Sequence, residues 1–102
     1  MKLRLALAQI NPTVGDLAGN AALIKQSVDQ AVGAGAHIAI FPEMVLTGYP
    51  VEDLALRPSF QVASKSALAA LASELDKSIV SIVGYLDQVA GKPQNMVAVI
   101  SG

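Results

Sequence analysis

The chain has 102 residues, of which 53% are hydrophobic and only 15% are charged, and its formal net charge is -1. This length is that of one domain, and the apolar composition suits strands that are covered by helices rich in small residues. No cluster of Lys and Arg is present, which argues against the basic surface that nucleic-acid binding requires. The sequence has no cysteine, so these residues contain no disulfide, thiolate metal site or cysteine nucleophile.

The amino-terminal residues do not form a convincing secretory signal. Arg4 and Gln9 interrupt the apolar segment, and no clear cleavage site follows it. No apolar run reaches the ~18 residues that a membrane-spanning helix needs. We therefore expect a cytoplasmic protein whose partners include neither nucleic acid nor a membrane.

A strand and a helix are predicted first. Residues 2–10 alternate between leucines and polar or small residues, which is typical of a strand with one buried face. A loop containing Pro and Gly follows. Asn20 is a candidate N-cap for a helix whose apolar residues recur at helical spacing until glycines stop it at Gly33.

A second strand is predicted at residues 37–41, a short apolar run bounded by Gly35 and Pro42. A strand, a helix and a strand within about 40 residues form a βαβ unit, so the two strands should run parallel. The long connection that follows, residues 42–58, should contain a short helix over residues 51–56.

The last third of the chain predicts an amphipathic helix over residues 59–76 and then a hairpin. Its strands are expected at residues 78–85 and 96–100, with a turn at residues 91–93. The predicted order is β-α-β-(short α)-α-β-β, a mixed α/β (α+β) fold. Two helices are few for four apolar strands, and a hydrophobic sheet needs a layer on each face. We therefore expect residues 1–102 to be an incomplete N-terminal segment of a larger domain, or to need a partner.

Glu43 is the first candidate site residue. In open α/β sheets, ligands bind beyond the carboxyl ends of parallel strands, and Glu43 lies two residues past Phe41 at such an end. Pro42 ends the strand and limits how the chain carrying the glutamate can move. From the residues alone, two interpretations stay open: a solvated loop acid and a catalytic carboxylate.

Other polar residues are weaker candidates. Glu52 and Asp53 are adjacent and would not face each other on a helix, so we expect them to stabilise the N-terminus of the short helix. Tyr49 follows Gly48 and could form a pocket wall or simply cover the core. His37 is the only histidine and precedes a strand, which indicates a boundary or core position.

Three segments carry a family resemblance. LRLALAQINPTVGDLAGN (3–20) resembles the opening of the nitrilase, or carbon–nitrogen hydrolase, superfamily. AIFPEMVLTGYPVEDL (39–54) resembles its first catalytic motif, and residues 79–102 fit its next hairpin. The T-G-Y-P-x-E-D-L form is particularly similar to the glutaminase domains of glutamine-dependent NAD synthetases.

This resemblance implies an α-β-β-α sandwich in the complete domain and a Glu-Lys-Cys catalytic triad. Only the glutamate maps onto this chain, at Glu43, as general base and acid. The resemblance places the family's lysine just beyond Gly102, and the chain has no cysteine. It also implies a parent enzyme that hydrolyses glutamine and passes ammonia to a domain that converts deamido-NAD to NAD. That parent would use ATP and Mg and would be a homo-oligomer, while no cofactor or metal is expected in this segment.

Two other functions stay open at this point. The chain could belong to another carbon–nitrogen hydrolase, such as an amidase, carbamoylase or nitrilase, with the same Glu43 motif. It could also be a non-catalytic α/β interaction module that associates through its unfinished sheet.

The missing cysteine and lysine lead to a prediction. The purified 102-residue chain should release no ammonia from glutamine above the uncatalysed rate, because a lone carboxylate has no nucleophile to activate. A coupled glutamate dehydrogenase assay checks this. Ammonia release at a rate typical of an enzyme would contradict the assigned triad.

Overall fold

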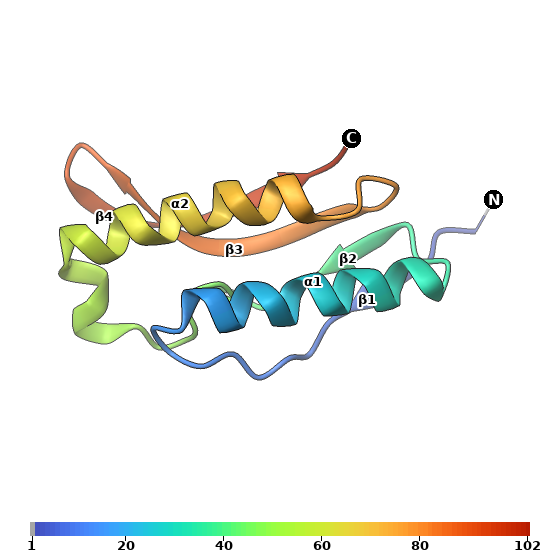
Figure 1. The fold of residues 1–102 in the computed structure, drawn as a ribbon, viewed down its shortest axis with the longest axis horizontal. Coiled ribbons are helices and arrows are strands. Elements are labelled where there is room, and N and C mark those ends of the chain that lie inside the picture. The colour runs from blue at the N-terminus through green and yellow to red at the C-terminus, as the bar shows by residue number, and fades with distance from the viewer. Residues whose placement is uncertain (1) are drawn as a thin grey trace.

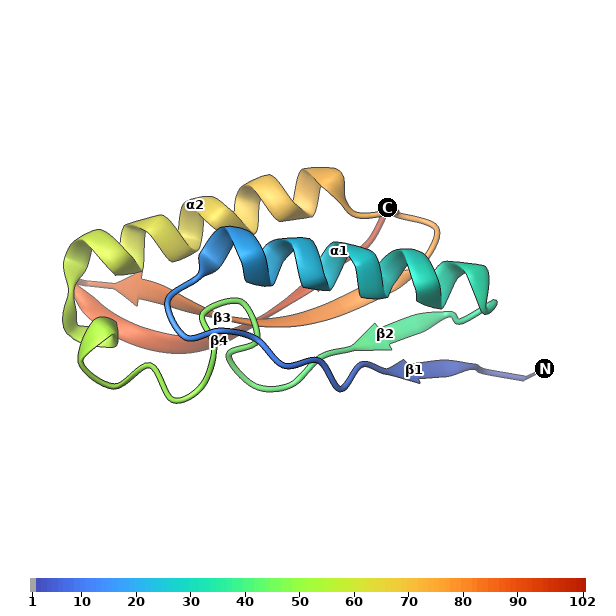
Figure 2. The same ribbon diagram turned by 60° about the horizontal axis from the view of Figure 1, so that its bottom comes forward.

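The computed structural model describes residues 2–102. Two helices lie side by side on one face of a four-stranded sheet (Figure 1, Figure 2). In chain order, the elements are β1 (Leu5–Leu7), α1 (Leu17–Gly33), β2 (Ile38–Ile40), the 3₁₀ helix η1 (Glu52–Leu56), α2 (Pro58–Glu74), β3 (Val80–Val89) and β4 (Lys92–Ile100). This confirms the predicted mixed α/β class and the predicted order of elements. No helix within residues 2–102 is long and apolar enough to cross a membrane.

The strands are arranged in the sheet in their sequence order, β1-β2-β3-β4. The pairs β1–β2 and β2–β3 are parallel, and β3–β4 is antiparallel. The predicted βαβ unit and the predicted hairpin are therefore both present. Because β1, β2 and β3 run in the same direction, their carboxyl ends meet at one edge of the sheet.

The first strand is shorter than the predicted range 2–10. Only Leu5–Leu7 is regular strand, although ladder-like bonds flank it: His37 N donates to Arg4 O (2.8 Å) and Ala8 N donates to Ile40 O (2.9 Å). β1 lies at the edge of the sheet, so it has a single neighbour, β2, to define its length. The alternation in the sequence indicates which residues could pair in a strand. The number that do pair is limited by the neighbouring strand β2, which has three residues.

The predicted N-cap of the first helix is wrong. Helix α1 begins at Leu17, and Asp16 is the N-cap, with Oδ1 accepting a hydrogen bond from Gly19 N at 3.0 Å. Asn20 lies one turn inside the helix and is 1% exposed. Asp and Asn are equally good capping residues, and Asn20 instead directs its amide to neighbouring loops.

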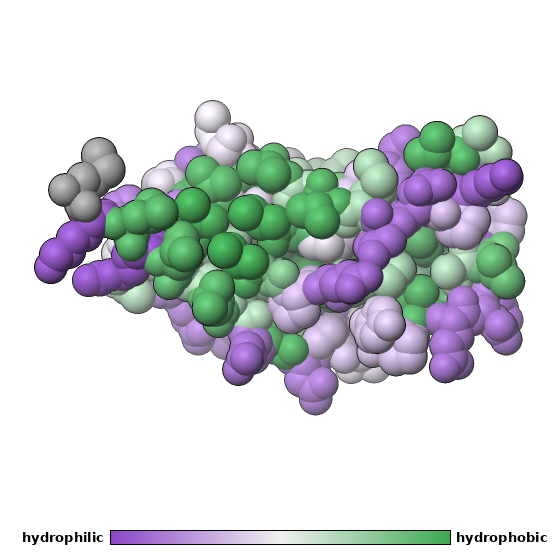
Figure 3. Space-filling view, turned by 180° about the vertical axis from the view of Figure 1, so that it is seen from behind, coloured by the Kyte–Doolittle hydropathy of each residue, from purple (hydrophilic) through white to green (hydrophobic). Residues whose placement is uncertain are grey.

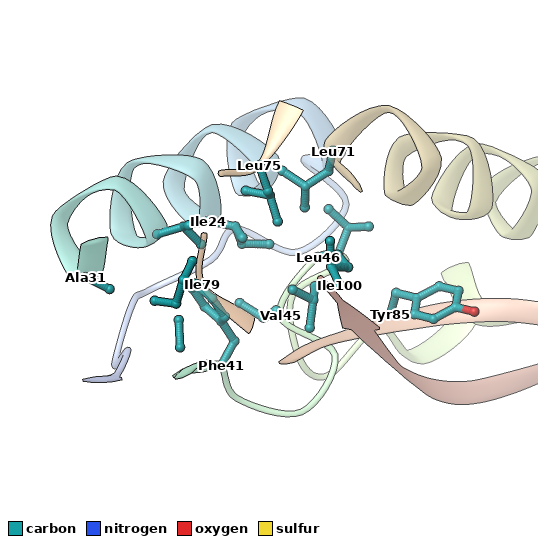
Figure 4. Packing of buried hydrophobic residues seen from close by; sticks show 13 residues of the cluster. Ile24, Ala31, Phe41, Val45, Leu46, Leu71, Leu75, Ile79, Tyr85 and Ile100 are labelled. Atoms are coloured by element: carbon teal, nitrogen blue, oxygen red, sulfur yellow. The ribbon is translucent and has the colours of Figure 1, made fainter. Parts of the chain in front are cut away.

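The core fills the space between the helices and the sheet (Figure 4). Ile24 and Val28 of α1 and Leu71 of α2 are almost fully buried, as their helical spacing predicted. Two polar residues of α2, Gln61 and Ser64, are buried as well, and Gln61 Nε2 donates to Ala55 O at 2.6 Å. The predicted apolar stripe of this helix therefore omitted two buried polar positions, of which Gln61 binds the neighbouring η1 segment.

The other face of the sheet has no helix on it. Leu7 is 71% exposed and Val99 is 68% exposed, whereas Ala39 of β2 lies beneath α1 and is 1% exposed. Viewed from behind, hydrophobic side chains gather over this face (Figure 3). Its exposed large residues are Leu3, Leu5, Leu7, Val97 and Val99; we call this surface the open face. Because side chains alternate across a strand, each strand contributes every second residue to it.

The hairpin is longer and more regular than predicted. Its strands pair without interruption from Val89–Lys92 to Ser81–Ile100. The turn consists of Ala90 and Gly91, with φ of 52° and 77°. Positive φ at both central residues is the pattern of a type I′ turn, whose twist matches that of the flanking strands.

The turn predicts a glycine-specific effect. Gly91→Ala should lower the free energy of unfolding by about 1 kcal/mol, because an L-side chain disfavours the left-handed region. A Cβ at Gly91 meets nothing within 4 Å, so conformational strain is the only cost. Urea denaturation measures the change. Gly33→Ala is the matched control, since a Cβ there also meets nothing within 4 Å and its φ is not positive; equal effects of the two substitutions would contradict the prediction.

Candidate active site

Glu43 lies just past the carboxyl end of β2, as predicted. The strand ends at Ile40, and Phe41 N still donates to Ile82 O at 3.1 Å, so the chain is held against β3 until the residue before Pro42. Glu43 itself is exposed. A rigid parallel strand therefore delivers this carboxylate to the edge of the sheet where α/β proteins bind their ligands.

The loop after Glu43 is tightly folded and buried. Met44 has φ of 52°, a left-handed conformation that is uncommon outside glycine. The carbonyl of Met44 accepts hydrogen bonds from Gly48 N (2.9 Å) and from Thr47 Oγ1 (3.2 Å). Val45 and Leu46 are completely buried in the core. These contacts make the base of Glu43 a defined turn, although it has no regular secondary structure.

A buried amide ties this loop to the one before α1. Asn20 Nδ2 donates to Leu46 O (2.9 Å) and to Thr13 O (2.8 Å), and its Oδ1 accepts from Thr13 N (2.8 Å). Gly15 N also donates to Thr47 O at 2.9 Å. The local sequence predicts a helix cap at Asn20, because no local pattern indicates partners seven and 26 residues away.

Gly84 allows the Glu43 loop to lie directly against β3. A Cβ at this position would be 2.6 Å from Met44 N and 3.2 Å from Pro42 O, both backbone atoms. Leu46 N donates to Gly84 O at 3.2 Å, which fixes the approach from the other side. Glycine within a strand often marks such a close approach of backbone, so the sequence did contain a signal for this contact.

Glu43 borders a hollow of about 330 Å³ on the open face. β3 contributes Ile82 and Gly84 to its lining, and β4 contributes Asn95 and Val97; the remaining lining residues are Phe41, Pro42 and Glu43. The hollow combines apolar walls with a carboxylate and an amide. Such a site can hold a small polar molecule with its reacting group at Glu43.

Asn95 is the hydrogen-bond partner of Glu43. Asn95 Nδ2 donates to Glu43 Oε1 at 2.5 Å across 52 positions of sequence. Glu43 forms no ion pair within residues 2–102, where the two salt bridges are Lys25–Asp29 and Lys65–Asp87. Its second oxygen, Oε2, has no hydrogen-bond partner among these residues and can therefore accept a proton. Sequence reasoning missed Asn95, because a single amide in an apolar strand has no local pattern that indicates a site.

The other candidates lie apart from this hollow. Tyr49 is 67% exposed and is not among the residues that line it, so its role as a pocket wall stays a prediction. Glu52 and Asp53 are exposed in the first turn of η1, consistent with helix stabilisation. His37 is exposed and its Nδ1 accepts from Arg4 N at 2.9 Å, which makes it a boundary residue at the other end of β2.

A second carboxylate, Asp87, has structural contacts only. Gln88 N donates to Asp87 Oδ1 (2.6 Å) and Tyr85 Oη donates to Asp87 Oδ2 (3.0 Å). The backbone hydrogen bond from Gln88 is the main cause that lowers the pKa of Asp87, and the Tyr85 hydroxyl adds to it. Burial raises the pKa of Tyr85, and the bond to Asp87 raises it further. Asp87 is thus kept ionised. Both of its carboxylate oxygens already accept hydrogen bonds, from Gln88 N and Tyr85 Oη.

A larger hollow, about 630 Å³, lies between α1 and α2, away from Glu43. Alanines form most of its lining, and its only charged residues are Lys25 and Glu74. Size alone therefore does not identify the functional site here. The smaller hollow beside Glu43 contains the groups that can do chemistry.

Residues 4–102 match the carbon-nitrogen hydrolase family. The chain belongs to that family. Within the carbon-nitrogen hydrolases, it is 43% identical over 89 residues to a glutamine-dependent NAD(+) synthetase of Rhodobacter capsulatus, a match that covers 85% of the chain and 16% of the relative. The chain corresponds to the N-terminal region of such synthetases.

Solved structures agree with this placement. The glutamine-dependent NAD+ synthetase from Acinetobacter baumannii, in complex with adenosine diphosphate, is 31% identical with a TM-score of 0.83, covering 97% of the chain and 19% of that protein. An amidase from Nesterenkonia sp. is 21% identical with a TM-score of 0.68, covering 93% of the chain and 36% of that protein. The amidase shows a shared fold, and the higher identities favour the synthetases over the amidase alternative. The chain spans less than a fifth of the length of the synthetases it matches.

The contact at Gly84 predicts how this carbon-nitrogen hydrolase segment positions its glutamate. Gly84→Ala should cost about 1–3 kcal/mol of unfolding free energy, the usual cost of overpacking, and should displace the backbone at residues 42–46. Amide chemical shifts of uniformly ¹⁵N-labelled chain check the displacement. Gly91→Ala serves as control, since it strains a distant turn and should leave the four amide shifts of residues 43–46 in place. Unchanged shifts in the Gly84 variant would show that the loop does not depend on this approach.

Proposed function

We propose that this chain is part of the glutaminase domain of a glutamine-dependent NAD synthetase, in which Glu43 is the general base and acid. One observation carries the proposal: Glu43 is held at the carboxyl end of β2, beside a hollow, in a chain similar to such synthetases. The Oε2 atom of this exposed residue has no hydrogen-bond partner within residues 2–102 and is available for proton transfer.

The proposed reaction begins with a cysteine supplied by the rest of the domain, because this chain contains none. Glu43 accepts the thiol proton as the sulfur attacks the amide carbon of glutamine. The tetrahedral intermediate collapses, its C–N bond breaks, and the nitrogen leaves as ammonia with the proton that Glu43 returns. Glu43 then takes a proton from water, which attacks the thioester and releases glutamate and the thiol. A lysine from the rest of the domain, the third triad member, would stabilise the negative charge on the amide oxygen.

The exposed hydrophobic residues of the open face favour a further layer of the same domain that covers them. Five large hydrophobic residues are exposed on this side of the sheet, Leu3, Leu5, Leu7, Val97 and Val99, and such an area is unusual for a surface in contact with water. We propose that the remainder of the domain covers it with a second sheet, completing an α-β-β-α sandwich. The same layer would bring the cysteine and lysine towards the hollow, which lies on this face.

The parent protein would then use the ammonia in a second reaction. We propose that a separate domain amidates deamido-NAD with ATP and Mg, that the parent is a homo-oligomer, and that it is cytoplasmic. The adenosine diphosphate bound by the Acinetobacter synthetase supports a nucleotide site in the whole protein. Residues 2–102 contain no group of three or more His, Cys, Asp or Glu that could hold a metal ion. We propose that ATP and Mg bind in that separate domain.

Glu43→Gln tests the proposed function in the full-length protein. The variant keeps the size of the side chain but cannot accept the thiol proton, so glutamine-dependent NAD formation should fall by at least about 10²-fold, within the range for loss of a general base. NAD formation from added ammonium chloride should be unchanged, because ammonia bypasses the glutaminase site. Glu52→Gln is the matched control, since this exposed acid lies outside the hollow. Normal glutamine-dependent turnover in the Glu43 variant would refute the role of Glu43.

A further inference from the structure

We propose that Asn95 is a positioning residue that holds the Glu43 carboxylate in the orientation needed for proton transfer. This inference rests on the proposed glutaminase function. It adds a residue from a different part of the chain, on β4, to the site formed after β2.

The contact between the two side chains has a fixed polarity. An ionised carboxylate only accepts hydrogen bonds, so the amide must present its N–H₂ group to Glu43. Asn95 Nδ2 engages Oε1, and Oε2 keeps no partner within residues 2–102. One oxygen is thus anchored while the other is left free to take the proton. The amide N–H is too weakly acidic to transfer its proton at neutral pH, so Asn95 orients the base without competing in the reaction.

Asn95 is a rigid support for a side chain that is otherwise poorly restrained. Its strand pairs without interruption along the whole hairpin, and Asn95 lies opposite Leu86. Leu86 is 1% exposed and packs with Met44, the residue after Glu43. The loop that carries the glutamate and the strand that carries the amide are therefore fixed to the same buried contact. The glutamate side chain has several rotatable bonds and is exposed, so a second anchor is needed to restrict it to one orientation.

The hydrogen bond between Asn95 and Glu43 is expected to contribute little to the stability of the fold. Both side chains are exposed, and an exposed polar contact contributes little net free energy to folding. Alignment of the base is different, because a small misplacement of a reacting group can greatly slow a reaction. The expected signature of Asn95 is therefore a change in kcat with a nearly unchanged melting temperature.

The experiment uses the full-length protein that carries this segment and three substitutions. Asn95→Leu removes the donor at similar size, and Asn95→Asp keeps the shape but replaces the donor with an acceptor. Gln94→Leu is the control, because the neighbouring side chain is also exposed, lies on the opposite face of β4 and makes no hydrogen bond within residues 2–102.

Both Asn95 substitutions should lower kcat for glutamine hydrolysis about tenfold or more, as expected when a bond to a charged group is lost. The KM for glutamine should stay within about twofold, because the bond is not to substrate. NAD formation from ammonium chloride and the melting temperature should match those of the unsubstituted protein and of Gln94→Leu. An unchanged kcat in both Asn95 variants overturns the proposal, and so does a raised KM at constant kcat, which would assign Asn95 to substrate binding.

A double substitution separates this inference from the function on which it rests. If Asn95 acts through Glu43, Glu43→Gln combined with Asn95→Leu should be no slower than Glu43→Gln alone. If the reductions in rate caused by the two substitutions instead multiply in the double variant, Asn95 has a role independent of Glu43, and the positioning proposal is overturned. Full glutamine-dependent activity in Glu43→Gln alone would instead refute the proposed function itself, whatever the Asn95 variants do.

Discussion

The buried amide of Asn20 holds together two loops on which the candidate site depends. Its three hydrogen bonds join Thr13, in the loop before α1, to Leu46, in the loop that follows Glu43. Asn20 is 1% exposed, so each of these polar groups would lose its partner in a nearly dry environment if the amide were absent. The Glu43 loop has no helix or strand of its own, and this amide takes the place of the backbone ladder that regular structure would supply.

Close backbone approach complements the amide. Gly84 leaves room for Met44 N beside β3, and Gly48, with φ of 80°, leaves room for the backbone of Val14. A side chain at Gly48 would come within 2.7 Å of Val14 Cα. Loops thus pack on strands and on each other without intervening side chains, which holds the chain around Glu43 between the core and the hollow.

The two faces of the sheet have different roles. The helical face is closed by α1 and α2 and contains the main core, with Ile24, Val28 and Leu71 at its centre. The open face carries exposed hydrophobic residues together with Glu43 and Asn95. In the proposed complete domain, the contact that buries the apolar residues would also enclose the site and exclude water from it. Assembly of the domain and formation of its catalytic centre would then be one event.

The sequence alone determined the order of elements, the apolar helix faces and the position of Glu43 after a parallel strand. These features are local, because they follow from periodicity, from proline and glycine, and from the chain direction of neighbouring strands. Family resemblance assigned Glu43 its proposed role, while the residues alone left it open between a loop acid and a catalyst. The predicted positions of the helix cap and of the hairpin strand ends differ by a few residues from those in the structure, where Asp16 is the cap and β3 extends to Val89. The reason is that neighbouring residues are equally suited to cap a helix or to end a strand.

Only the tertiary structure decided which distant groups meet. The amide of Asn20 finds Leu46 O across 26 positions, and Asn95 finds Glu43 across 52. A single asparagine has the same local signature whether it caps a helix, ties two loops or orients a carboxylate. Its partner is set by the register of the sheet and the path of the loops, and those depend on the packing of the whole chain.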